Sequence, residues 1–132
     1  MASQEFKVLE IRSGEHEGIL WVSVGFASDA KEDDLLHFVC ALSVDAQDRK
    51  LGHNSMYMER SDQGLSCYSG AEKIVVSRNS IDLKLNVRGR KSLALPKQVV
   101  FSASNRLNGW AAALKVFGRM ALQECGRVLD AA

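Results

Sequence analysis

The sequence predicts an α+β fold, a mainly antiparallel β-sheet of about six or seven strands with one C-terminal helix packed on a face. Three observations support this fold class. Residues 81–87 alternate between apolar and polar side chains, which is the period of a strand with one face in the core. The connections are rich in Gly, Ser, Asn and Asp. Near the C-terminus, apolar residues recur at steps of three and four, the period of a helix.

The first half of the chain contains three candidate strands. Residues 5–11 alternate as a half-buried edge strand would. Residues 19–26 are largely apolar on both alternating faces, so we expect this strand at the centre of the sheet with both faces covered. Residues 35–44 have a mixed spacing that allows a strand or a short helix, and their aromatic and β-branched residues favour a strand. Residues 45–53 follow as a polar excursion.

The middle of the chain, residues 54–87, has the clearest periodicity. Residues 55–60 are expected to form a strand. Residues 61–70, SDQGLSCYSG, contain too much turn chemistry for a regular element and predict a loop. Residues 72–77 and 81–87 then predict a β-hairpin that turns through an asparagine.

The C-terminal part predicts a basic loop over residues 87–93, a strand over residues 98–103 and then a helix. Ser104 or Asn105 is a suitable N-cap, and Gly126 is a plausible C-cap. We expect this helix to span about 20 residues and to lay Trp110, Leu114 and Phe117 across the sheet.

Composition restricts the class of protein. Hydrophobic residues at 46% and charged residues at 25% are typical of a globular chain, and 132 residues predict a single domain, residues 1–132. The longest apolar segments are too short to span a membrane, and the N-terminus lacks the apolar segment of a signal peptide, so we expect a cytoplasmic protein with no membrane partner. Three widely spaced cysteines fit reduced thiols better than a disulfide framework.

The two ends of the chain differ in charge although the net charge is +1. Residues 1–53 contain five Lys and Arg against ten Asp and Glu, whereas residues 54–132 contain twelve against six. Two interpretations remain open: an acidic and a basic face presented to a partner, or ordinary solvated charges that interleave in space. The small basic loop at residues 87–93 lacks interleaved aromatic residues, which argues against nucleic acid as a partner.

Catalytic and metal-binding candidates are sparse. No histidine or cysteine pair has the spacing of a metal site, and no Gly-rich phosphate loop is present, so we expect no metal and no cofactor. One enzymatic alternative uses Cys67 as a nucleophile with His37 or His53 as its base. Another uses the carboxylates Glu59 and Glu72 as a general acid/base pair. A ligand-binding or assembly module that uses a free sheet edge is a third alternative.

A resemblance to a known family is carried mainly by residues 56–87. The order there is a strand with Tyr and Glu, a loop that ends in an aromatic residue and a glycine, and a hairpin of alternating residues. The residues that carry it are Tyr57, Glu59, Asp62, Gln63, Tyr68, Gly70, Ile74, Leu83 and Leu85. The stretch from Val24 to Ala27 and the downstream Leu114 and Phe117 fall in similar order, whereas Ala71 and the tail after Cys125 depart from the pattern. The chain thus resembles immunity protein family number ten of bacterial polymorphic toxin systems.

This resemblance implies a small cytoplasmic protein that binds and neutralises a cognate protein toxin by occlusion, without catalysis. The expected partner-binding residues are Tyr57, Glu59, Asp62 and Tyr68, because they lie in or beside the loop at residues 61–70. A homodimer is left open.

Overall fold

Nine strands form one continuous sheet within residues 3–29, 31–61 and 64–131, the part of the chain that the computed structural model describes. The strand order is β5-β4-β3-β2-β1-β8-β7-β6-β9. The strands are β1 (Ser3–His16), β2 (Ile19–Phe26), β3 (Asp34–Ala41), β4 (Tyr57–Arg60), β5 (Ser66–Tyr68), β6 (Ala71–Val76), β7 (Ser80–Leu85), β8 (Gln98–Ser102) and β9 (Leu129–Ala131). The helices are α1 (Ala46–Lys50), α2 (Val87–Leu93), α3 (Trp110–Met120) and the 3₁₀ turn η1 (Glu124–Gly126).

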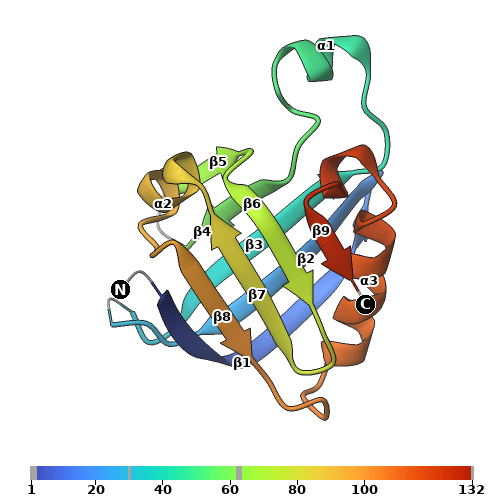
Figure 1. Ribbon diagram of the computed structural model, residues 1–132. Coiled ribbons are helices and arrows are strands. Elements are labelled where there is room, and N and C mark those ends of the chain that lie inside the picture. Colours follow the sequence, from blue (N-terminus) through green and yellow to red (C-terminus); the bar gives the residue numbers. More distant parts are fainter. Residues whose placement is uncertain (1–2, 30, 62–63, 132) are drawn as a thin grey trace.

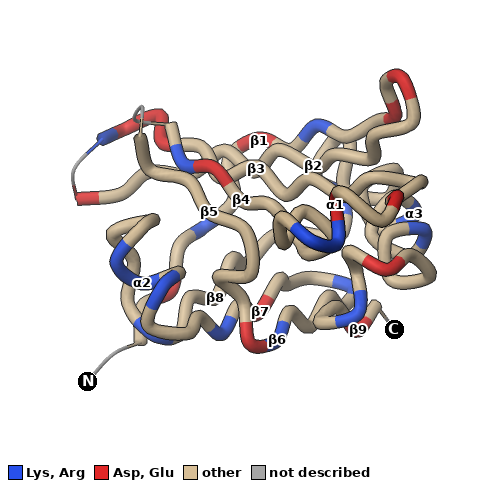
Figure 2. The backbone as a smooth tube through the Cα atoms, turned by 90° about the horizontal axis from the view of Figure 1, so that it is seen from above, with Lys and Arg blue, Asp and Glu red and all other residues tan. Residues whose placement is uncertain are grey.

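The long strand β1 belongs to both halves of the sheet. Its first residues pair in parallel with β8, and from Val8 onward it pairs antiparallel with β2. The sheet folds over along β1, so that β1–β5 form one layer and β6–β9 form a second layer across from it (Figures 1 and 2). Each layer therefore has an inner face toward the other layer and an outer face that points away from it.

Apolar residues on the inner faces form the core. In β2 the alternation places Leu20, Val22, Val24 and Phe26 inward, all with no exposed surface. The ring centroid of Phe26 lies 5.0 Å from that of Phe101 in β8, which joins the two layers. Each large side chain buried in this way stabilises the fold by about 2 kcal/mol.

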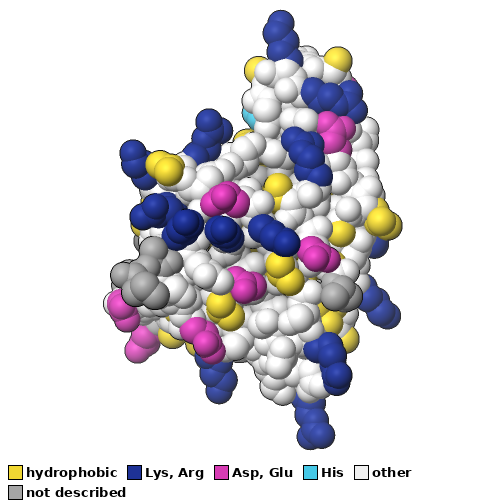
Figure 3. All heavy atoms as spheres, viewed as in Figure 1, with side chains coloured by type: hydrophobic (Ala, Val, Ile, Leu, Met, Phe, Trp, Pro, Cys, Tyr) yellow, Lys and Arg dark blue, Asp and Glu magenta, His cyan; other side chains and the backbone are white. Residues whose placement is uncertain are grey.

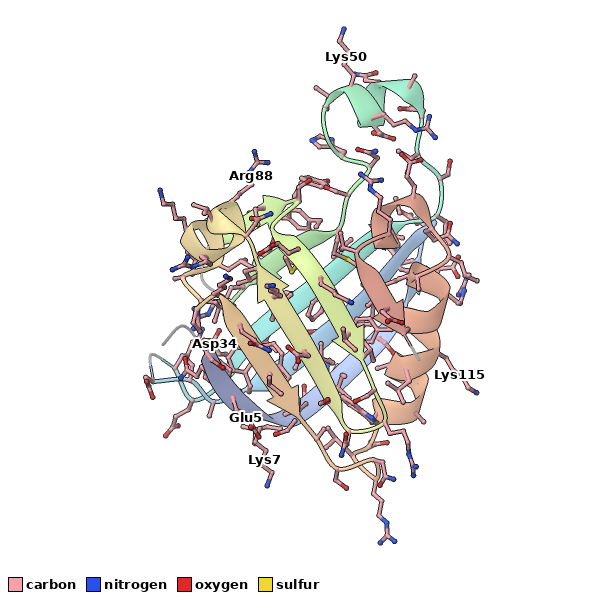
Figure 4. The ribbon with its side chains drawn as sticks, viewed as in Figure 1. Glu5, Lys7, Asp34, Lys50, Arg88 and Lys115 are labelled. Carbon is pink, nitrogen blue, oxygen red and sulfur yellow. The ribbon has the colours of Figure 1, made fainter. Side chains whose placement is uncertain are left out.

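Two helices lie at the open sides between the layers (Figure 2). α3 contacts β1, β2 and β9, and its Phe117 ring packs edge-on against Phe38 at 5.5 Å. The indole N–H of Trp110 donates to the carbonyl oxygen of Arg78 at 2.6 Å, which fixes the start of the helix against the β6–β7 turn. Lys115 points from α3 away from the sheet (Figure 4), so the helix presents its apolar side to the core. No helix in the described residues is both long enough and apolar enough to cross a membrane.

The fold class is confirmed, but the prediction of six or seven strands is wrong. The two strands that the sequence analysis missed are β5, inside the predicted loop at residues 61–70, and β9, in the tail after Gly126. Each has three residues, too few to show an alternating pattern. Their conformation is set by their neighbours, since β5 pairs with β4 and β9 pairs in parallel with β6. The segment at residues 35–44, for which a strand or a short helix was possible, is a strand as predicted, but β3 ends at Ala41.

The helices also differ from the prediction. The expected basic loop at residues 87–93 is helix α2, whose N-cap Asn86 accepts a hydrogen bond from the backbone N–H of Gly89 at 2.9 Å. The polar segment at residues 45–53 contains helix α1. Lys50, at the end of α1, extends away from the body of the protein (Figure 4).

The C-terminal helix is shorter than expected. It has 11 residues and starts after Gly109, whose φ of 88° lies in the left-handed region, instead of at Ser104 or Asn105. Its C-cap is Ala121, and Gly126 lies in η1. Trp110 and Phe117 are buried as predicted, whereas Leu114 is only partly buried.

Candidate functional site

The outer face of strands β1–β5 carries two rows of aligned side chains. Strand pairing places residues directly opposite each other on the same face of the sheet. The first, the aromatic row, consists of Gly14, Trp21, Val39, Tyr57 and Tyr68. The second, the polar row, consists of Arg12, Ser23, His37, Glu59 and Ser66. We call these two rows, together with Glu10 and Leu35 beside them, the outer face.

The centre of the outer face is a shallow depression of about 520 Å³. The residues that line it come from four strands: Glu10, Arg12, Trp21, Ser23, Leu35, His37, Val39, Tyr57 and Glu59. Gly14 gives the indole of Trp21 room to lie across β1, since a Cβ at Gly14 would lie 3.2 Å from the ring. In the described residues no helix covers this face, because α2 and α3 lie between the layers and α1 lies beyond the ends of the strands (Figures 1 and 2).

An aromatic series continues the depression toward the edge strand β5. The ring centroids of Tyr57 and Tyr68 lie 4.9 Å apart, and the ring of His53 stacks on Tyr68 at 4.5 Å. The Tyr57 hydroxyl donates to Oε1 of Glu59 at 2.8 Å. A hydrogen bond with Ser66 lowers the pKa of Tyr57, but burial and the Glu59 carboxylate outweigh it and leave that pKa above its ordinary value. The phenol therefore stays protonated at neutral pH and holds the carboxylate in place.

Three of the four residues expected to bind a partner lie together on this face. Tyr57, Glu59 and Tyr68 belong to β4 and β5, which are adjacent. The fourth, Asp62, lies outside the described residues. Their function as contact residues stays a prediction.

The sequence analysis did not identify Trp21 as part of the site, and it considered His37 only as a base for Cys67. The alternation of residues 19–26 already placed Trp21 opposite the core residues, but we expected both faces of that strand to be covered. The strand is central, yet its outer side is open: Trp21 is only partly buried and lines the depression. Which face of a strand lacks a covering layer depends on the rest of the fold and has no local signal.

The structure does not bring the Cys67 thiol together with either of its candidate bases. Cys67 is opposite Met58, which has no exposed surface, so its side chain leaves the sheet on the inner side. His37 is in the polar row, and His53 stacks on Tyr68 of the aromatic row. Both candidate bases are therefore on the opposite face from the thiol. Burial also raises the pKa of Cys67, against smaller lowering effects of Ser92 and Arg88, so its thiolate form is disfavoured.

The carboxylate pair is not assembled either. Glu59 is on the outer face of the β1–β5 layer, while Glu72 is an exposed residue of β6 in the other layer. The described residues contain no group of three or more His, Cys, Asp and Glu placed to hold a metal ion.

A buried ion pair fixes the end of β4 beside Glu59. Nη2 of Arg60 lies 2.7 Å from Oδ2 of Asp34, and Nη1 donates to the carbonyl oxygens of Leu93 and Ala94 at 2.9 and 2.8 Å. Burial raises the pKa of Asp34, but hydrogen bonds from Arg60, Ser28 and Ser61 and the charge of Arg60 outweigh it and hold that pKa below its usual range. This network ties β3, β4 and the end of α2 together, so the outer face rests on a rigid support.

Comparison with known proteins gives one result. Neither the curated proteins nor the solved structures contain a match. The family model described as Immunity protein 10 matches residues 8–108. The matched segment includes both rows of the outer face and ends before α3, so Leu114 and Phe117 lie beyond it. A match over this much of the 132 residues places the chain in a known family: it belongs to the Immunity protein 10 family.

Proposed function

We propose that this protein neutralises a cognate protein toxin in the bacterial cytoplasm by binding it with the outer face, without catalysis. Family membership supports toxin neutralisation as the biological role. The observation that carries the choice of surface is the aromatic row, which leaves Trp21, Tyr57 and Tyr68 partly exposed on one open sheet face.

The residue types on this face suit a protein interface. Trp, Tyr and Arg are the residues that most often dominate binding energy, and the outer face combines Trp21, Tyr57, Tyr68 and Arg12. Five adjacent strands at the usual spacing span roughly 20 Å, which suits the centre of an interface that buries about 800 Å² on each partner.

The outward side of the β6–β9 layer is the surface with which we compare the outer face. Figure 3 shows basic (Lys or Arg) and acidic side chains interspersed over β6–β9, with small apolar areas between them. Here Val75, Asp82, Lys84 and Val100 are in sheet positions comparable with those of the outer face, but no tyrosine or tryptophan is among the described residues of these strands. We assign no partner to this face, and neither nucleic acid nor a membrane is part of the proposal.

The proposal predicts a toxin gene beside this gene, and the test uses the toxin that it encodes. Trp21→Ala, Tyr57→Ala and Tyr68→Ala are each expected to weaken binding about 10-fold to 100-fold in calorimetry, because an interface anchor contributes about 1.4–3 kcal/mol. Val75→Ala and Lys84→Ala on the opposite layer are the controls and are expected to stay within about twofold. In cells that co-express the toxin and one variant, growth is expected to rank the variants in the same order as their affinity for the toxin.

Two outcomes would contradict the proposal in different ways. If the wild-type protein neither binds the neighbouring toxin nor rescues growth, the function is wrong. If it binds, but the three outer-face variants together with Glu59→Ala and Asp62→Ala keep full affinity, the function stands and the surface is wrong. Circular dichroism confirms that each variant is folded before its affinity is interpreted.

A further inference from the structure

Acidic residues are concentrated in the first part of the chain and basic residues in the rest. Residues 3–61, which include β1–β4, contain six Lys and Arg against eleven Asp and Glu, whereas residues 64–131, which include the uncharged β5 and all of the second layer, contain eleven against four. Figure 2 shows acidic positions along the β1–β4 layer and its loops, and a group of basic positions at α2. Of the two interpretations of the charge asymmetry, the structure thus supports an acidic and a basic side.

The outer face contributes directly to the acidic side. A second depression, of about 400 Å³, adjoins the central one and shares Glu10 and Leu35 with it. Apart from Asp34, which pairs with Arg60, the two depressions are lined by four carboxylates: Glu10, Glu32, Asp33 and Glu59. Arg12 is the one Lys or Arg among the described lining residues, and its Nε already lies 3.2 Å from Oε1 of Glu10. The face therefore has an excess of negative charge.

The arrangement around Val39 fits a planar cation. Val39 lies in the aromatic row between Trp21 and Tyr57, and their strands are separated only by β3, which puts the two backbones roughly 10 Å apart. A guanidinium group stacks on aromatic rings and pairs with carboxylates through parallel hydrogen bonds. Oε1 of Glu59 accepts from Tyr57, while Oε2 accepts no hydrogen bond from the described residues, and Glu59 lines the open depression.

We infer that the outer face receives a basic surface of the toxin, with an arginine side chain seated over Val39 against the carboxylate of Glu59. This inference rests on the proposed function and specifies the chemistry of its partner. Charge complementarity selects a cationic partner surface over a second copy of this chain, because two copies of this acidic face repel each other.

The test measures binding of the neighbouring toxin as a function of salt and of single charges. Glu59→Gln keeps an acceptor for the Tyr57 hydroxyl and removes only the charge, and Glu10→Gln removes a second lining charge. Each is expected to weaken toxin binding at least about fivefold. The association rate of the wild-type protein is expected to fall at least about tenfold between 50 and 500 mM NaCl. The association rate of the double variant, Glu10→Gln with Glu59→Gln, is expected to fall less over the same range. Glu72→Gln and Asp82→Asn in the other layer are charge-matched controls and are expected to stay within about twofold.

The outcomes separate this inference from the proposed function. Suppose that the wild-type protein binds the toxin with an association rate independent of salt, and that both glutamine variants keep its affinity. This result overturns the inference of a basic partner surface and leaves the proposed neutralisation intact. Binding that Lys84→Ala weakens as much as Glu59→Gln also overturns it, because the contact surface would then be elsewhere. Absence of any wild-type binding refutes the proposed function, and this inference fails with it.

Discussion

Replacing Arg60 by Met is expected to remove several kcal/mol of stability, because it leaves Asp34 buried without its cation. The side chains of Arg60 and Asp34 are 9% and 4% exposed, and the guanidinium donates to the Asp34 carboxylate and to two carbonyl oxygens at the end of α2. Methionine retains most of the apolar stem, so the loss is mainly that of the charge and its hydrogen bonds. Breaking a buried ion pair from one side costs about 3–5 kcal/mol, a large part of the 5–15 kcal/mol that stabilises a typical domain.

The dependence of this loss on pH identifies its cause. In the wild-type protein the pKa of Asp34 is lowered below 3.8, so its stabilising contribution is fully present above that value and is lost as pH falls through the folded pKa. In Arg60→Met, burial is no longer offset by the guanidinium, and the pKa of Asp34 is expected to rise. The unpaired carboxylate then destabilises the variant most at neutral pH. The cost of the substitution is therefore expected to be larger at pH 7 than at pH 3.

Urea denaturation followed by circular dichroism measures both quantities. A double-mutant cycle with Asp34→Asn isolates the pairwise coupling, and Arg60→Lys tests whether the planar group is needed in addition to the charge. A loss below about 1 kcal/mol at pH 7, or a loss that is equal at the two pH values, would refute the argument from an uncompensated buried charge.

Two further predictions concern single residues. Gly89→Ala is expected to lower the free energy of unfolding by at least about 2 kcal/mol in urea denaturation, because its Cβ would overlap the carbonyl oxygen of Gly70. As a control, Gly118→Ala in α3 has open space and is expected to raise the free energy of unfolding by up to about 1 kcal/mol. Equal effects of the two substitutions would contradict the close approach of α2 to Gly70. Burial raises the pKa of Cys67, so its reaction with a disulfide reagent at pH 7 is expected to be slower than that of a free thiol and to accelerate as pH rises. A rapid reaction at pH 7 in the folded protein would restore Cys67 as a candidate nucleophile.

Local patterns predicted those parts of the fold that local forces decide. Ile81, Leu83 and Leu85 alternate with polar residues, and all three lie in the core with no exposed surface. By contrast, α2 depends on a cap: its sequence contains Gly89 and several basic residues and resembles a loop, yet Asn86 provides the N-cap and the close packing on Gly70 requires that glycine. Strands β5 and β9 have only three residues each, too few for an alternating pattern, and their conformation is set by pairing with β4 and β6.

The site was predictable to the extent that it lies near one stretch of sequence. Tyr57 and Tyr68 are 11 positions apart in the same stretch as Glu59, which predicts their proximity, and their rings lie 4.9 Å apart. Trp21 and His37 join them only through the pairing of β2, β3 and β4, which no local pattern encodes. Family membership supports the proposed biological role, and the register of the sheet supplies the residues proposed to carry it.

Along these strands, side chains alternate between the core and the outer face, so different residues serve folding and the proposed binding. In β4, Met58 is fully buried and Arg60 holds the ion pair, while their neighbours Tyr57 and Glu59 line the open depression. Substitutions at the outward positions remove little core packing, so Tyr57→Ser or Glu59→Lys is expected to change affinity for a toxin far more than the free energy of unfolding. Alternate residues of the same strand can therefore change independently, one set constrained by the core and the other by the proposed partner. An outer-face substitution that unfolded the protein as severely as Met58→Ala would contradict this division of roles.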